Sequence, residues 1–449
     1  METNTTSIEQ KNKLLIKGVI ITLLVLLLLI PAHFIQNLIQ EREQRQKEAT
    51  AEVSSKWAGR QNIAGPVLVL PYLQYDSDTM ANKIKHKHFA YFLPDALDIN
   101  STVTPQKKYR GIYKVMLYTS KINISGSFTE IKTEKLNIQS NDVLWNEAFV
   151  RINIADVKGL NDPLKLTWNN QDIVLSPQPA EDHSLQGLNG VLNISSANDL
   201  KNIHFSSDIN LSGSEQLLFT PLGSSTAVNL SSSWPNPSFT GDALPQSTVI
   251  KDNGFTASWK SLSQKRNFPQ QWKDDAFGIY KYAAPQTDTN NNTINISASA
   301  FGADLFIPVN GYQKILRSVK YAVLCILLTF AAFFLIETVN KKSVHPFQYA
   351  LIGLALILFY TLLLSFSEYI GFNAAYMIAA LATIGLIAWF VKGILLSGKP
   401  STVLSTVLVL VYSYVFTILQ LQDYALLLGS IGLFLMLAVI MYFSRRIQW

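Results

Sequence analysis

Residues 321–336 have the sequence YAVLCILLTFAAFFLI, residues 340–345 have NKKSVH, and residues 346–367 have PFQYALIGLALILFYTLLLSFS. The first and third stretches contain no charged residue, and uncharged apolar runs of this length are typical of membrane-spanning helices. The polar stretch between them contains Lys341 and Lys342. Because Lys and Arg in short loops favour the cytosolic side of a membrane, the pattern predicts a membrane hairpin whose bend lies in the cytosol.

The same criterion predicts six membrane crossings in the whole chain. We expect them at 18–39, 319–339, 346–367, 369–391, 400–422 and 424–444, with cytosolic tails at 1–17 and 445–449. The first run lacks the short apolar core and small-residue cleavage site of a signal peptide, so we interpret it as an uncleaved anchor. The basic residues that set this orientation are Lys341, Lys342, Lys392, Lys399, Arg445 and Arg446. Residues 40–316 are then predicted to lie outside the cytosol, in the periplasm.

Three cations oppose this orientation. Lys314, Arg317 and Lys320 lie at the outer end of the second predicted crossing. They flank a very long translocated region, where the loop-charge rule carries little weight. We therefore keep the prediction that both termini are cytosolic.

The region between the first two crossings has the pattern of a β-rich domain. Short segments rich in β-branched and aromatic residues alternate with clusters of Gly, Pro, Asn, Asp and Ser, a pattern typical of all-β sandwiches or barrels. The phrase INISGS at 122–127 returns as INLSGS at 209–214. This repeat indicates either two similar β lobes or chance recurrence of strand and turn chemistry. The predicted fold class is an α+β membrane protein, with one N-terminal helix, a large extracytoplasmic β-rich domain at 40–316 and a five-helix C-terminal bundle.

Composition and charge limit the possible partners. The chain of 449 residues is 48% hydrophobic and 15% charged, with a formal net charge of +6. Much of the basic excess flanks the apolar runs, which favours membrane orientation over nucleic-acid binding. The lipid bilayer is thus an expected partner and a nucleic acid is not. The single cysteine, Cys325, rules out an intrachain disulfide.

Two short motifs resemble binding sites. Residues 393–399, GILLSGK, resemble a phosphate-binding loop, but Pro400 follows and the segment joins two predicted membrane helices instead of a strand and a helix. His86 and His88 would share one face of a strand, but a metal site needs further ligands that the sequence does not indicate. We therefore expect no cofactor, no metal and no catalytic residue.

Ionisable residues of the crossings lie near their ends. Glu337, His345, Glu368 and Asp423 all fall there, where interfacial water and snorkelling reduce the cost of burial. Ion-coupled carriers and proton pumps usually place an ionisable residue deeper in the membrane. The pattern thus argues against an energised transporter.

Several ordered phrases of the sequence contain Trp234, Pro235, Pro237, Ser238, Phe239, Gly241, Glu337, His345, Pro346, Glu368, Gly371 and Asp423. Over nearly the whole chain, these phrases resemble the CreD family of inner-membrane proteins. The resemblance implies a bacterial envelope protein associated with envelope integrity, colicin tolerance and a two-component stress response, and it implies no catalytic residue. The family's Trp-Pro-His-Pro is Trp-Pro-Asn-Pro here, so we interpret this loop as structural.

Three functional hypotheses follow. The first is a non-enzymatic inner-membrane protein whose periplasmic β domain supports or senses the envelope, with an unidentified envelope component or protein as partner. The second is a transporter or lipid-handling protein whose β domain shields an apolar ligand. The third is a membrane-bound hydrolase, which would need a nucleophile, base and orienting group clustered in the fold. A long apolar groove in the β domain would favour the second hypothesis, and a solid core would count against it.

Overall fold

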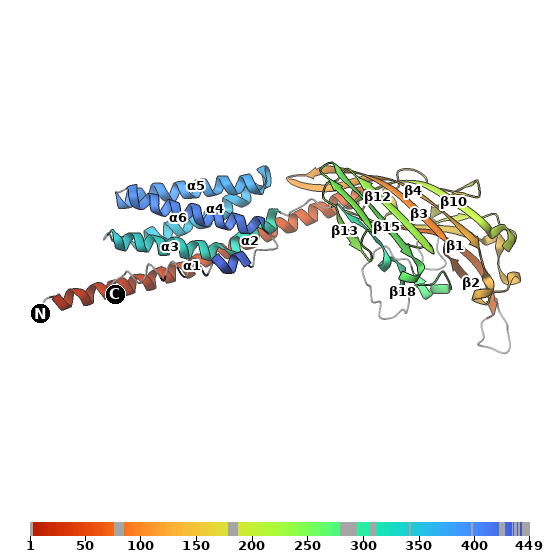
Figure 1. Cartoon of the computed structure of the whole chain (residues 1–449), viewed down its shortest axis with the longest axis horizontal. Helices are drawn as coiled ribbons and strands as arrows, with labels where there is room; N and C mark the ends of the chain where they lie inside the picture. The colour runs from red at the N-terminus through yellow and green to blue at the C-terminus, as the bar shows by residue number, and fades with distance from the viewer. Residues whose placement is uncertain are drawn as a thin grey trace. The chain divides into compact units, whose positions relative to one another are not determined.

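The computed structural model describes residues 3–75, 85–177, 187–278, 294–305, 311–340, 343–396, 398–421 and 427–432, with the single positions 434, 438 and 441. The chain divides into two compact units (Figure 1). One unit comprises Met1–Glu48 and Val309–Trp449 and is helical; the other comprises Ala49–Pro308 and is rich in β-strands. This confirms the predicted fold class.

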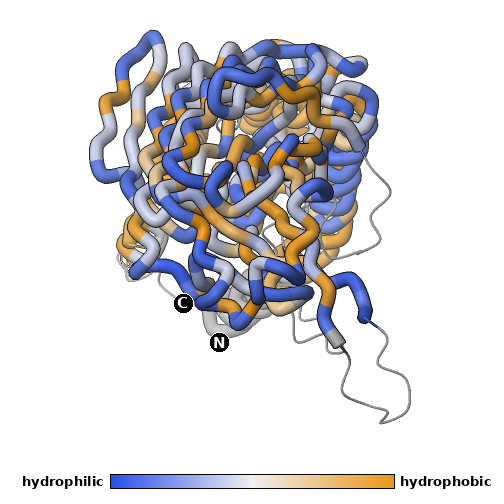
Figure 2. Tube along the Cα trace, turned by 90° about the vertical axis from the view of Figure 1, so that its right-hand side faces the viewer, coloured by the Kyte–Doolittle hydropathy of each residue, from blue (hydrophilic) through white to orange (hydrophobic). Residues whose placement is uncertain are grey.

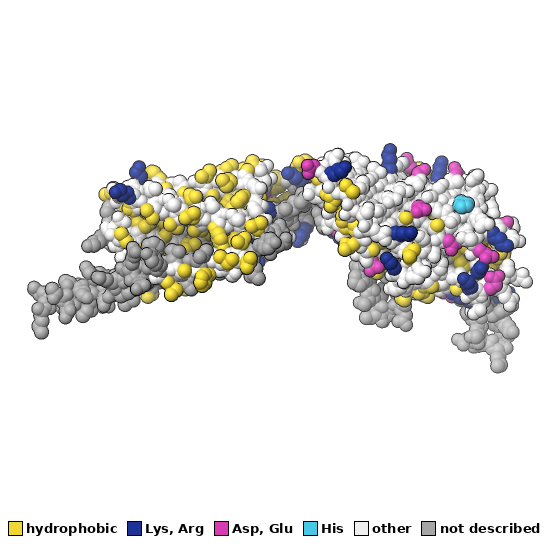
Figure 3. All heavy atoms as spheres, viewed as in Figure 1, with side chains coloured by type: hydrophobic (Ala, Val, Ile, Leu, Met, Phe, Trp, Pro, Cys, Tyr) yellow, Lys and Arg dark blue, Asp and Glu magenta, His cyan; other side chains and the backbone are white. Residues whose placement is uncertain are grey.

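The helical unit consists of long apolar helices. Its elements are α1 (Thr3–Trp57, whose last turns belong to the other unit), α2 (Gly311–Lys320), α3 (Ala322–Val339), α4 (Pro346–Ile370), α5 (Phe372–Leu395) and α6 (Gly398–Gln420). Among the described residues, five helices are long and apolar enough to cross a membrane, namely α1 and α3 to α6. Residues 427–432 of the sixth predicted crossing are helical, and most of the rest of that segment lies outside the described residues. Hydrophobic side chains cover much of the visible surface of this unit, as membrane contact requires (Figure 3).

Helices α3 to α6 form a closed ring of neighbours. α3 packs against α4, α4 against α5, α5 against α6, and α6 against α3. Buried aromatic side chains fill the centre: the Phe359 ring centroid lies 5.3 Å from that of Tyr376 and 4.6 Å from that of Tyr412. The Tyr376 hydroxyl donates a 2.8 Å hydrogen bond to the Tyr412 carbonyl oxygen. The ring is therefore a packed bundle rather than an open channel at this level.

The long helix α1 buries one apolar stripe against this bundle. The buried side chains recur at helical spacing and are Val25, Leu28, Ala32, Ile35 and Ile39. Residues between them, such as Leu27 and Phe34, are more than half exposed, which suits contact with lipid. Gly353 of α4 allows the close approach, because a Cβ there would lie 2.2 Å from Leu28 Cδ1.

This close approach gives a first prediction. We expect Gly353→Ala to lower the free energy of unfolding by about 1–3 kcal/mol, because the new methyl group overpacks the contact with Leu28 and Phe330. Unfolding of the purified full-length protein in detergent, followed by tryptophan fluorescence, measures the change. Gly385→Ala is the matched control, since nothing lies within 4 Å of a Cβ at Gly385 of α5. Equal effects of the two substitutions would contradict the packing.

Helix α2 was not expected as a separate element. The sequence predicted one crossing at 319–339, whereas the structure has a break at Tyr321, with φ −86° and ψ 1°, between α2 and α3. The break falls where the residue pattern changes. α2 is amphipathic, with Tyr312, Ile315 and Val319 buried, and α3 is apolar on every side.

The β unit contains two large sheets. The 9-stranded sheet has the order β13 (Ser238–Gly241), β19 (Phe301–Asp304), β11 (Gln216–Phe219), β1 (Gln61–Tyr75), β5 (Phe149–Ile154), β9 (Leu188–Val191) and β8 (Ser176–Pro177), with β2 (Lys85–Phe92) on β1 and β16 (Gln271–Lys273) on β2. The 8-stranded sheet has the order β14 (Ser247–Lys251), β15 (Gly254–Leu262), β12 (Ser225–Ser232), β3 (Ala96–Arg110), β4 (Tyr113–Glu130), β10 (Lys201–Ser214), β6 (Lys165–Trp168) and β7 (Gln171–Val174). A small pair joins β17 (Phe277–Gly278) and β18 (Ile294–Asn295). Short 3-10 helices fill connections at Thr133–Leu136, Ser140–Asp142, Trp145–Glu147, Val157–Gly159, Ala197–Leu200, Ser263–Lys265, Asp274–Ala276 and Ile296–Ser299.

Alternation along the strands builds a filled interior. In β10, Ile203, Phe205, Ser207, Ile209 and Leu211 are buried, and residues 204, 206, 208 and 210 between them are exposed. The same alternation of hydrophobic and hydrophilic positions is visible along the chain trace (Figure 2). Apolar side chains from both large sheets join one continuous core. Within the described residues, this continuous core counts against a long apolar groove between the sheets.

The repeated phrase does not mark two lobes. Its two copies lie on neighbouring antiparallel strands, β4 and β10, with Ile122 directly opposite Ile209. Asn123 donates a 2.8 Å hydrogen bond from Nδ2 to Asp208 Oδ1 on the same pair of strands. The copies resemble each other because the two strands are neighbours. Their apolar side chains point into the same core, and the polar side chains between them point to the same outer face.

Candidate functional site

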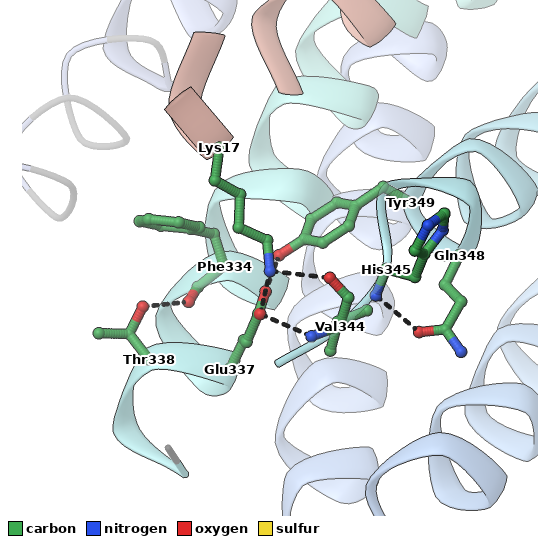
Figure 4. Close-up of polar contacts among 8 residues, drawn as sticks. All are labelled: Lys17, Phe334, Glu337, Thr338, Val344, His345, Gln348 and Tyr349. Carbon is green, nitrogen blue, oxygen red and sulfur yellow. Dashed lines mark hydrogen bonds and ion pairs between the residues drawn. The ribbon is translucent and has the colours of Figure 1, made fainter. Parts of the chain in front are cut away.

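The hairpin of α3 and α4 contains a buried carboxylate near its bend. Glu337 lies in the last turns of α3, and its side chain is 7% exposed. Lys17 of α1, Val344 of the bend and Tyr349 of α4 surround it (Figure 4). Three helices thus meet at one carboxyl group.

Each oxygen of Glu337 accepts a hydrogen bond. Lys17 Nζ forms an ion pair with Oε1, the Val344 N–H donates to the same oxygen at 2.8 Å, and the Tyr349 hydroxyl donates to Oε2 at 2.7 Å. Lys17 Nζ also donates to the Val344 carbonyl oxygen at 2.8 Å. The charge is therefore neutralised by Lys17 and shared with the bend. The position of Glu337 at the end of a crossing predicts that interfacial water or snorkelling stabilises it, but the structure instead buries it with a partner.

His345 and Pro346 shape the start of α4. His345 Nδ1 accepts a 3.2 Å hydrogen bond from the Phe347 N–H, and the His345 N–H donates to Gln348 Oε1 at 3.2 Å. Pro346 occupies the first helical turn, where a missing N–H costs nothing. An accepting Nδ1 places the imidazole proton on Nε2 in this arrangement. His345 therefore caps a helix and does not contact the Glu337 carboxylate.

The other end of α4 contains a second partly buried carboxylate. Glu368 is 11% exposed in its side chain, and its Oε1 accepts a 3.0 Å hydrogen bond from the Tyr312 hydroxyl of α2. Arg42 of α1 lies 4.0 Å from the same oxygen through Nη1. Gly371 ends α4 with φ 82°, a backbone conformation that favours glycine.

The two carboxylates hold α1 at two separate heights. Lys17 and Arg42 are 25 residues apart, which is about 38 Å along a helix at 1.5 Å per residue. The hydrocarbon core of a bilayer is about 30 Å thick. Both contacts therefore fit the two membrane interfaces, with the apolar stripe of α1 between them. We call Lys17–Glu337 and Arg42–Glu368 the end contacts.

The end contacts are better explained by a role in helix packing than by a catalytic role. Both oxygens of Glu337 already accept hydrogen bonds from three different segments, so the carboxylate joins α1, the bend and α4. Removing one partner of such a buried pair is strongly destabilising, because it leaves an uncompensated charge. Sequence reasoning identified Glu337 and Glu368 but missed Lys17, Tyr349 and Arg42. Lys17 and Arg42 flank the first apolar run, and a basic residue in that place looks like an ordinary interface residue.

The family-like positions of the β unit lie in one loop around Trp234, which is 6% exposed. Its indole N–H donates a 2.9 Å hydrogen bond to the Asn236 carbonyl oxygen, and Lys107 Nζ lies 5.2 Å from the ring centroid. The loop carries the chain from β12 in one large sheet to β13 in the other. The remaining motif positions there are Pro235, Pro237, Ser238, Phe239 and Gly241. These contacts agree with our interpretation of the loop as structural.

Gly241 and Phe239 extend the same packing. Gly241 has φ 103°, and a Cβ there would lie 2.2 Å from the Ala300 carbonyl oxygen. The Phe239 ring lies edge-on to Trp259 with centroids 5.7 Å apart. The conformation and the close approach together require glycine at this position.

The histidine pair of β2 has a different environment. His88 Nδ1 lies 3.1 Å from Asp274 Oδ1, and its ring lies 5.6 Å from that of Tyr72. Burial, with the nearby Asp274 carboxylate, raises the pKa of the Tyr72 hydroxyl. Among the residues that the structure describes, no three His, Cys, Asp or Glu side chains gather as a metal site.

The orientation residues are only partly described. Lys392 in the last turn of α5 and Lys399 in the first turn of α6 are exposed. Lys and Arg side chains gather at the ends of the helical unit on its visible face (Figure 3). Gly398 begins α6 directly after α5, so the phosphate-loop resemblance lacks the strand it would need. Lys341, Lys342, Asp423, Arg445 and Arg446 lie outside the described residues.

Comparison with known proteins identifies the family of the chain. The family model of the inner membrane protein CreD matches residues 13–449. The inner membrane protein CreD of Escherichia coli (strain K12) is 29% identical over 430 residues, which cover 95% of this chain and 91% of the relative. The resemblance noted from the motifs is thus confirmed over nearly the full length, and the chain belongs to the CreD family of inner membrane proteins, with several membrane-spanning helices.

Proposed function

We propose that this protein is a non-enzymatic inner-membrane protein whose periplasmic β domain supports or senses the cell envelope by binding a hydrophilic envelope component. The observation that carries the proposal is the distribution of polarity in the β unit. Apolar side chains from both large sheets form one core, and the outward positions of the long strands carry hydroxyl, amide, carboxylate and basic side chains. Such a surface is suited to a polar partner rather than to an apolar ligand.

We propose that the partner binds at a depression on the 8-stranded sheet. Strand register places Asp98, Ser125, Ser206 and Thr167 in one row across β3, β4, β10 and β6. Short serine side chains between longer ones leave a depression of about 430 Å³. Its full lining is Ala96, Asp98, Ser125, Gly126, Ser127, Thr167, Asn170, His204, Phe205 and Ser206. This mostly polar lining favours a hydroxyl-rich or amide-rich partner.

The turn between β6 and β7 fixes one wall of the depression. Asn169 and Asn170 have φ 46° and 66°, as two-residue hairpin turns of type I′ require. Asn169 Oδ1 accepts a 2.9 Å hydrogen bond from the His204 N–H, and the Asn169 N–H donates to the His204 carbonyl oxygen at 2.9 Å. The wall is therefore attached to β10 and does not depend on a partner for its shape.

Photo-crosslinking in living cells tests the proposal. A photoreactive amino acid at Ser206, inside the depression, should yield an adduct with a protein or glycan of the envelope. The same probe at Tyr109, which is 65% exposed near the end of β3, is the matched control and should not yield that adduct. No adduct from Ser206, or the same adduct from both positions, would contradict the proposal. Adducts with phospholipid alone would favour the lipid-handling alternative.

The proposed topology places both termini in the cytosol and residues 40–316 in the periplasm. We infer this topology from the lysines in the loops between crossings, because the packing of the helices does not determine the orientation in the membrane. We predict that Lys341→Glu with Lys342→Glu disturbs insertion of the second and third crossings, because the bend loses the charge that keeps it cytosolic. Reporter fusions on both sides of the membrane measure this. Unchanged reporter accessibility would contradict the orientation, and Lys47→Glu, in the polar part of α1, is the control.

A further inference from the structure

Helix α2 has an unusual charge pattern for the end of a membrane bundle. Its ten residues, Gly311–Lys320, include Lys314, Arg317 and Lys320 and no acidic residue. A spacing of three residues keeps the cations on one side of a helix. The opposite side buries Tyr312, Ile315 and Val319.

Contacts with three helices fix α2 at one end of the bundle. Tyr312 donates to Glu368 in the last turn of α4. Lys314 Nζ donates to Gln420 Oε1 at the end of α6, at 3.0 Å, and lies 5.5 Å from the ring centroid of Phe372 at the start of α5. Since these are the ends of membrane-spanning helices, α2 lies at a membrane interface.

Among the residues that the structure describes, no carboxylate forms an ion pair with the three cations of α2. The nearby carboxylate, Glu368, already interacts with Tyr312 and Arg42. Arg317 is partly exposed and Lys320 is exposed, and neither forms an ion pair with any carboxylate of the described residues. In the proposed topology this end is extracytoplasmic, where orientation does not call for basic residues. Three cations concentrated there need a different explanation.

We propose that the basic side of α2 binds the phosphate headgroup of an anionic phospholipid. Arg317 offers a planar donor fork that matches a phosphate, and Lys320 adds a mobile ammonium group beside it. Lys314, fixed by Gln420, supplies further positive potential. Each basic residue near an anionic membrane surface contributes attraction that decays within a Debye length. The buried apolar side of α2 holds this basic side at headgroup level.

Lipid competition on the purified full-length protein tests the proposal. Phosphatidylglycerol is titrated against phosphatidylcholine in mixed micelles, and bound lipid is quantified by native mass spectrometry. We expect wild-type protein to prefer phosphatidylglycerol. Each removed cation should weaken that preference about fivefold, so Arg317→Gln with Lys320→Gln should weaken it roughly 25-fold. Lys392→Gln with Lys399→Gln, in the last turn of α5 and the first turn of α6, is the matched control for the same loss of charge.

Specific outcomes would overturn the proposal. A double α2 variant that binds phosphatidylglycerol as wild type does, or a control variant that loses binding equally, would contradict it. Displacement of the lipid by inorganic phosphate at equal concentration would show that a free anion is the ligand. Lys320→Gln alone changes an exposed side chain and preserves folding, so its expected fivefold effect is measurable even if Arg317→Gln unfolds the protein. Failure here would leave the proposal for the β domain untouched.

Discussion

Replacing Glu337 by Ala is expected to lower the free energy of unfolding by about 3–5 kcal/mol, because it leaves the Lys17 ammonium group without its partner at a largely buried site. The Val344 N–H and the Tyr349 hydroxyl lose an acceptor at the same time. Thermal or denaturant unfolding of the full-length protein in detergent measures the loss. Glu41→Ala is the matched control: Glu41 is 54% exposed in its side chain and pairs with Arg45 on the same helix, so its removal should cost at most about 1 kcal/mol.

A second variant tests whether the unpaired charge causes the loss of stability. Lys17→Met combined with Glu337→Leu removes both charges, and buried ion pairs replaced by apolar residues are often neutral or stabilising. We expect the double variant to be more stable than Glu337→Ala. If Glu337→Ala unfolded like wild type, the contacts described at the hairpin bend would not exist in the folded protein. If the double variant were no better than the single one, the ion pair would not be the cause.

Replacing Trp234 by Ala is expected to lower the stability of the β domain by about 3–5 kcal/mol, the usual range for removing a buried large aromatic side chain. Asn236→His, which restores the histidine of the family's Trp-Pro-His-Pro, should change stability by no more than about 0.5 kcal/mol. The reason is that Trp234 hydrogen-bonds to the main-chain carbonyl of residue 236, whose side chain is exposed. Denaturant unfolding of both variants provides the comparison.

The opposite result at this loop would change its interpretation. If Asn236→His altered the adduct captured from the depression while stability stayed constant, the loop would take part in binding. If Trp234→Ala left stability unchanged, Trp234 would not be the anchor of the crossover between the two sheets.

Much of the membrane architecture was predictable, because uncharged runs and their charged ends depend on local sequence. α4 begins at Pro346, as the sequence indicated, because His345 and Pro346 form a local start signal. The break at Tyr321 within the predicted crossing at 319–339 was not predicted. The amphipathic α2 continues directly into the apolar α3, and counting charged residues alone does not separate the two helices. The repeat at 122–127 and 209–214 was ambiguous, since sequence does not show that β4 and β10 pair.

The candidate site was predictable in part. Glu337, His345 and Glu368 were identified by family-like phrases, but their roles depend on partners far away in the chain. Lys17 and Glu337 are 320 residues apart, and only the packing of α1 on the bundle brings them together. A basic residue at the edge of an apolar run is common, so nothing local distinguished Lys17 from the other lysines near it.

α1 belongs to the helical unit, where charged contacts hold it near both ends and the Leu28–Gly353 contact holds it in between. Disulfide formation in native membranes tests this most directly, in a Cys325→Ala background that removes the single native thiol. Leu28→Cys with Gly353→Cys should form a linked peptide on oxidation, detected by mass spectrometry after proteolysis without reduction. Leu27→Cys with Gly353→Cys should not, because Leu27 is 57% exposed on the other side of α1. Equal linking in both variants, or linking in the Leu27 variant alone, would contradict the account.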